Sequence, residues 1–157
     1  MFGINIPYLN VTENNLIYYN KASGGRNKAI DDRTEVKNYC MEIINDSVSN
    51  EKILASKEFE YSIKYYSAYN NRTKPLNIKS YAEIHEIISD DDIKKMIINI
   101  LNNSLKTKNG IWFFGRNEEY YFRCINLQDL EQILKQYKLN YDKNVHNDLY
   151  LIHVRFD

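Results

Sequence analysis

The sequence predicts a single domain of the α+β class, with helices packed on one face of a mostly antiparallel sheet. Some segments repeat apolar residues at helical spacing, and others alternate apolar and polar residues as half-buried strands do. No linker or internal repeat separates these segments. A chain of 157 residues can also bury a core without disulfides or a metal. We therefore expect residues 1–157 to form one compact domain.

The N-terminal half mixes both kinds of pattern. A capping box that starts at Asp32 predicts a helix from 33 to about 48. Residues 59–65 alternate apolar and polar side chains and are predicted as a strand, with a helix through Phe59 and Ile63 as the alternative. The other elements expected here are strands over 2–9 and 15–19, a polar loop over 20–28, a short helix over 51–56 and a helix capped by Ser80.

The C-terminal half is predicted to form a ββαβ unit after one further helix. Asp90 is expected to cap that helix, which has the clearest amphipathic pattern in the chain. Residues 111–114 and 120–125 are predicted as the strands of a hairpin. Asn126 caps the next helix, and residues 149–156 form the last strand.

Composition excludes several classes of protein. Lys plus Arg equals Asp plus Glu at 21 each, so a general affinity for nucleic acid is not expected, although a local basic patch would allow it. The two cysteines lie in no metal-binding spacing, which indicates reduced thiols and a cytoplasmic location. No apolar run is long enough to span a membrane. We expect no metal and no cofactor.

Tyrosine is abundant, with 14 residues in the chain. An AT-rich genome, such as that of a phage or another mobile element, would explain this, but tyrosine also offers a large and rigid contact area for recognition. The densest stretch gives the predicted partner-binding residues, with some of the rings expected in the core: Tyr61, Tyr65, Tyr66, Tyr69 and Arg72. The sequence therefore favours a protein-binding module, such as a stoichiometric inhibitor or an immunity-type antagonist.

A second hypothesis is a metal-independent endoribonuclease of the toxin type. His153 and Arg155 share one face of the predicted strand 149–156, and Arg123 would join them if the hairpin lies alongside. An imidazole beside two guanidinium groups provides an acid or base and cations for the charge on phosphorus. An ordinary solvated sheet face would also account for these residues. A weaker third hypothesis is a nucleotide site in the loop 23–28, which lacks the known phosphate-binding spacings.

Overall fold

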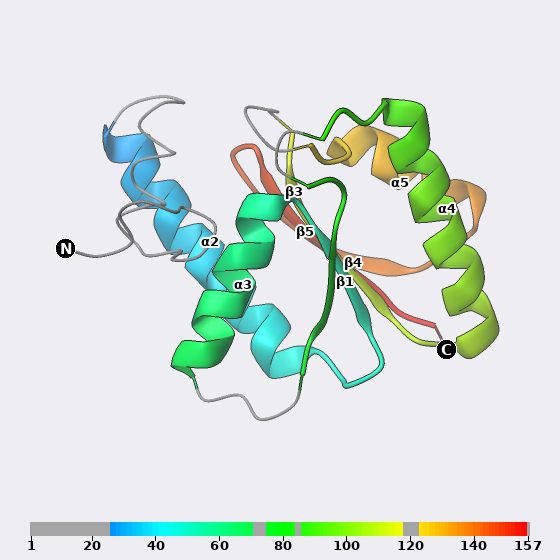
Figure 1. The fold of residues 1–157 in the computed structure, drawn as a ribbon, viewed down its shortest axis with the longest axis horizontal. Coiled ribbons are helices and arrows are strands. Elements are labelled where there is room, and N and C mark those ends of the chain that lie inside the picture. Colours follow the sequence, from blue (N-terminus) through cyan, green and yellow to red (C-terminus); the bar gives the residue numbers. More distant parts are fainter. Residues whose placement is uncertain (1–25, 71–74, 84–85, 118–122, 157) are drawn as a thin grey trace. The chain divides into compact units, whose positions relative to one another are not determined.

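The structure is a computed structural model that describes residues 26–70, 75–83, 86–117 and 123–156 (Figure 1). The strands predicted over 2–9 and 15–19 lie outside the described residues. In chain order the elements are α2 (Arg26–Asp46), β1 (Lys52–Ala55), α3 (Lys57–Tyr69), β2 (Asn77–Ser80), α4 (Asp90–Thr107), β3 (Ile111–Arg116), α5 (Leu127–Gln136), β4 (Tyr141–His146) and β5 (Leu149–Val154).

Contacts divide the chain into two compact units. The helical unit comprises Met1–Ser47 and Glu58–Pro75, and its described part holds α2 and nearly all of α3. The sheet unit comprises Val48–Lys57 and Leu76–Asp157, and it holds the five strands with α4 and α5. The single domain expected over 1–157 stays a prediction.

The α+β class is confirmed, but the sheet is mixed instead of mostly antiparallel. The strand order is β2-β1-β3-β5-β4. β1 pairs in parallel with both β2 and β3, while β5 pairs antiparallel with β3 and β4. The parallel pairs arise because a connection that contains a helix joins β1 to β2, and another joins β2 to β3. Each connection returns the chain to the end of the sheet at which the previous strand began.

The core of the sheet unit lies between the sheet and the two helices α4 and α5, which cover one of its faces (Figure 1). Every second residue of the central strands points to this face, as the period of a strand requires. The strands contribute Leu54, Ile111, Phe113, Tyr150, Ile152 and Val154, and the helices contribute Ile93, Ile97, Ile100, Leu101, Leu130, Ile133 and Leu134. Tyr150, Ile152 and Val154 of the predicted strand 149–156 thus share the core face, and His153 lies on the other.

Side chains cap both of these helices at their first turn. Ser89, one residue earlier than predicted, accepts a hydrogen bond from the backbone N–H of Asp92 at 3.1 Å. Asn126 caps α5 as predicted, and its Oδ1 accepts from the N–H of Asp129 at 2.9 Å. Each cap satisfies an N–H group that has no partner within the helix.

Several expectations about the N-terminal and middle segments were wrong. The segment 59–65 belongs to α3, because Phe59, Ile63 and Tyr66 are buried at helical spacing. Residues 52–55 form β1 instead of a short helix. Ser80 ends β2, and the described residues between it and Ser89 are not helical. The alternative for 59–65, a helix through Phe59 and Ile63, is therefore correct.

Among the described residues, the C-terminal half has the order β3, α5, β4, β5, which is βαββ instead of the predicted ββαβ. Residues 123–125 are not in a strand, and the rest of the expected second strand, 118–122, lies outside the described residues. The strand that the sequence did not predict is β4, which lies at the edge of the sheet. Most of its side chains are exposed, so no apolar alternation marks it in the sequence. A two-residue turn joins it to β5, and Asn147 adopts a positive φ of 53° there.

Candidate functional site

A groove of about 400 Å³ lies between α2 and α3 within the helical unit. We call it the tyrosine groove. Lys37 and Met41 line it from α2, one helical turn apart. The other lining residues, from α3 and the position after it, are Tyr65, Tyr66, Tyr69 and Asn70. Its size lies at the lower end of the range for ligand pockets.

The three tyrosine rings form one aromatic cluster. The ring of Tyr65 is stacked on that of Tyr69, with centroids 6.4 Å apart and planes at 21°. The same ring meets Tyr66 edge-on, at 5.0 Å and 76°. Tyr66 is only 3% exposed and anchors the cluster, whereas Tyr69 is 75% exposed. The cluster therefore presents an aromatic surface to solvent, at a cost in exposed apolar area.

Asn70 lines the groove directly after the end of α3. Its side-chain N–H₂ group donates to the backbone carbonyl of Tyr66 at 2.7 Å and lies 3.3 Å from Sδ of Met41. The backbone N–H of Asn70 also donates to the Tyr66 carbonyl, at 3.0 Å. These contacts tie the end of α3 to α2 and hold the methionine in place beside the rings.

The structure therefore brings three of the predicted partner-binding residues together. Tyr61 is half-buried and does not line the groove, and Arg72 lies outside the described residues. Lys37 and Met41 were missed. Their spacing of four residues marks them as neighbours on one face of a helix, but the sequence carries no signal that this face meets α3.

His153 lies in a buried polar cluster in the sheet unit. Its ring stacks on Trp112, with centroids 3.8 Å apart and planes at 9°. Nε2 of His153 lies 2.8 Å from Oε1 of Glu51, and Nε1 of Trp112 donates to Oε2 of the same carboxylate at 2.8 Å. The Val48 N–H also donates to Oε2, at 3.0 Å. The Nε group of Arg155 donates to Nδ1 of His153 at 3.3 Å, so Nε2 carries the proton toward Glu51.

The carboxyl group of Glu51 stays ionised in this cluster. Burial alone would raise the pKa of Glu51, but hydrogen bonds from Trp112, His153 and the Val48 N–H hold it below its ordinary value of 4.5. Gly110 leaves the room that the carboxylate needs, since a Cβ there would lie 2.3 Å from Oε1 of Glu51. The arrangement satisfies a buried charge, as the interior of a protein requires.

The cluster joins only two of the three residues of the ribonuclease hypothesis. His153 is 9% exposed, and both of its ring nitrogens have partners. The guanidinium group of Arg155 pairs with Asp142 at 2.8 Å. Arg123, which pairs with Asp90, precedes Cys124, and Cys124 contacts Arg116 at the end of β3. His153 lies opposite Trp112, near the start of β3.

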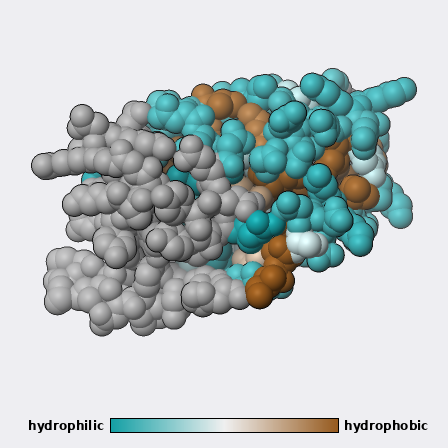
Figure 2. Space-filling view, turned by 90° about the horizontal axis from the view of Figure 1, so that it is seen from above, coloured by the Kyte–Doolittle hydropathy of each residue, from teal (hydrophilic) through white to brown (hydrophobic). Residues whose placement is uncertain are grey.

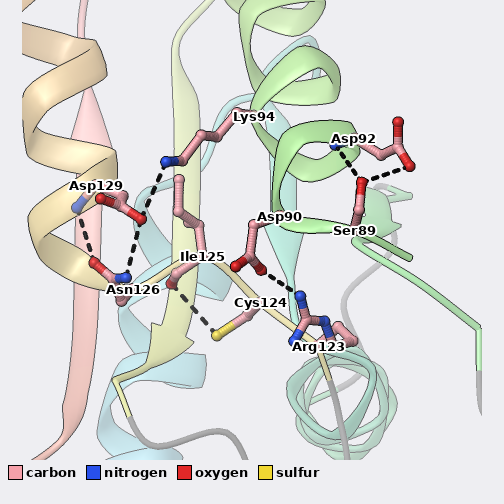
Figure 3. A network of polar contacts seen from close by, with 9 residues as sticks. All are labelled: Ser89, Asp90, Asp92, Lys94, Arg123, Cys124, Ile125, Asn126 and Asp129. Carbon is pink, nitrogen blue, oxygen red and sulfur yellow. Dashed lines mark hydrogen bonds and ion pairs between the residues drawn. The ribbon is translucent and has the colours of Figure 1, made fainter. Parts of the chain in front are cut away.

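A second pocket, of about 290 Å³, lies between the first turns of α4 and α5 (Figure 3). Arg123 reaches Asp90, and Nζ of Lys94 lies 3.4 Å from Oδ2 of Asp129. The side-chain oxygen of Asn117 accepts from the first N–H of α5 at 2.8 Å. These contacts pair each carboxylate with a cation and cap the helix, which is a structural role.

Few large hydrophobic side chains are exposed among the described residues. On the face seen in Figure 2, hydrophilic residues cover most of the coloured surface, and hydrophobic residues reach it in several areas. Among the described residues, Tyr69 is the aromatic member of the exposed large hydrophobic set, alongside Val48, Ile87 and Val145. The tyrosine groove is therefore the site that combines a cavity with an exposed aromatic ring.

Three further findings bear on function. Within the described part of the chain, no group of three or more His, Cys, Asp or Glu side chains is placed to hold a metal ion. None of the described helices has the length and hydropathy to cross a membrane. Comparisons with protein families, curated proteins and solved structures gave no match.

Proposed function

We propose that this chain acts by binding another protein through the tyrosine groove, as a stoichiometric antagonist of the inhibitor or immunity type. The observation that supports this proposal is the 75% exposure of Tyr69, whose ring stacks on that of Tyr65. Tyrosine loses few rotamers on binding and buries a large area, which is why it is enriched at interface hot spots.

Transfer of the Tyr69 ring into an interface would contribute about 2 kcal/mol from apolar burial. Loss of the ring should therefore weaken binding about 30-fold. Because Tyr69 is largely exposed in the free protein, Tyr69→Ala should leave the free energy of unfolding within about 0.5 kcal/mol of wild type. This separation of binding from stability is what distinguishes a recognition residue from a core residue.

Site-specific photo-crosslinking in the native host tests the proposal. A photoreactive phenylalanine derivative at position 69 should give one covalent adduct of defined mass. The same derivative in place of Val145, which is 48% exposed on β4, is the matched control and should give none. The captured protein is then purified, and its affinity for wild type and for Tyr69→Ala is measured by titration calorimetry. Equal crosslinking from both positions, or equal affinities, would contradict the proposal.

A further inference from the structure

We infer that the partner segment seated in the tyrosine groove is acidic, with one large apolar side chain beside Met41 and Tyr66 and a neighbouring carboxylate on Lys37. This inference rests on the proposed function, because it names the occupant of the same groove. Charge, shape and hydrogen bonding of the groove each contribute to it.

The charge of the groove is positive. Lys37 is the charged residue among those that line it, and its side chain is exposed. The acidic residues Glu35 and Glu42 lie more than 90° around α2 from Lys37, by the helical period of 100° per residue. They lie near Tyr39 instead. Burial raises the pKa of Tyr39, and the charges of Glu35 and Glu42 raise it further. An incoming carboxylate therefore meets an ammonium group without a competing acid on the groove wall.

Neither acid of α3, Glu58 or Glu60, lines the groove, and Glu58 precedes Tyr65 by about two turns of helix. Glu60 is buried and paired with Lys64 one turn along the helix. The helical period places both of them about 100° or more around α3 from Tyr65. The cation of Lys64 balances the anion of Glu60, so the pair adds no net charge near the tyrosine rings.

The apolar part of the groove suits one large side chain. Met41 and Tyr66 both line the cavity, and methionine adapts its shape to irregular partners. Edge-to-face contact with the aromatic cluster would favour Phe or Trp, and Leu would also fill such a space. The side-chain Oδ1 of Asn70 accepts no hydrogen bond from another described residue, so it offers an acceptor to a backbone N–H of the segment.

The charge and the shape together select against other occupants. A basic segment would bring a second cation close to Lys37 and be repelled. A fully polar segment would leave the exposed area of Tyr69 in water and gain little from the rings. An acidic segment with an apolar anchor satisfies both features of the groove, which is the usual balance between specificity from charge and affinity from burial.

Selection from a library of random 12-residue peptides displayed on phage provides the test. The purified chain is the target, and Tyr69→Ala and Lys37→Glu are parallel targets. Lys95→Glu makes the same charge change at an exposed lysine of α4 and is the matched control. Circular dichroism and thermal unfolding confirm that each variant is folded, as expected for substitutions of exposed side chains.

Peptides enriched on wild type should carry Asp or Glu close to Phe, Trp or Leu. Synthetic copies should bind Lys37→Glu about fivefold more weakly, as loss of an exposed ion pair predicts, and bind Lys95→Glu unchanged. Peptides that are lost on Tyr69→Ala but are neutral or basic would overturn the acidic occupant and leave the proposed function standing. Absence of any enrichment that depends on Tyr69 would overturn both.

Discussion

Replacing Glu51 with Gln tests the buried cluster around His153 most directly. One carboxylate oxygen accepts from Trp112 and Val48, and the other faces Nε2 of His153. The amide oxygen of Gln can keep the first two bonds, but its N–H₂ group then faces the N–H of His153. A change of the His153 tautomer would only move this conflict to Nδ1, which already accepts from Arg155.

The substitution therefore removes one buried, charge-assisted hydrogen bond. Such a bond contributes about 2 kcal/mol when a partner is lost. With a urea m-value of roughly 2 kcal/mol per molar for a domain of this size, the unfolding midpoint should fall by about 1 M. Urea titration followed by the fluorescence of Trp112 measures it, because this indole is itself part of the cluster.

The pH dependence gives the same experiment a second readout. The pKa of Glu51 is held below 4.5 in the folded state, so its carboxylate contributes its full stabilisation above that pH. Below pH 4.5 the unfolded chain takes up the proton first, and the stabilisation is lost as pH falls through the folded pKa. The difference in stability between wild type and Glu51→Gln should thus shrink as pH falls below 4.5. Equal stabilities at pH 7, or a difference that is unchanged down to pH 3, would refute the reasoning.

Three further predictions concern the core and caps of the molecule. Gly115→Ala should lower the free energy of unfolding by about 2 kcal/mol, because the new Cβ would lie 2.4 Å from the hydroxyl of the buried Tyr150; a thermal midpoint equal to wild type would contradict this. Asn126→Ala should cost about 1 kcal/mol in urea titration through loss of the bond to the Asp129 N–H, whereas Asn126→Ser should recover most of it. Cys40 is fully buried, and burial raises the pKa of its thiol, so a thiol reagent should label it only after unfolding; rapid labelling of the native protein would show that α2 opens.

Local sequence determined those elements whose stability comes from their own pattern. The apolar positions of α4 repeat at helical spacing, and a polar cap precedes α5, so both helices were predicted close to their observed bounds. The strands β3 and β5 are short runs of β-prone, apolar residues, and both were predicted in the right place. In each case the pattern that predicts the element lies within a few neighbouring residues. Side chains this close in sequence interact before tertiary contacts form.

Tertiary structure alone decided the rest. The alternation over residues 59–65 favours a strand, and only the burial of Phe59 and Ile63 on one side selects the helix. β4 has no apolar face, so its place at the edge of the sheet follows from pairing with β5. The groove joins Lys37 to Tyr69 across more than thirty residues of chain, and the cluster joins Glu51 to His153 at a separation of 102. Tyrosine content could suggest recognition, but only packing between distant segments determines which rings are buried and which remain open to a partner.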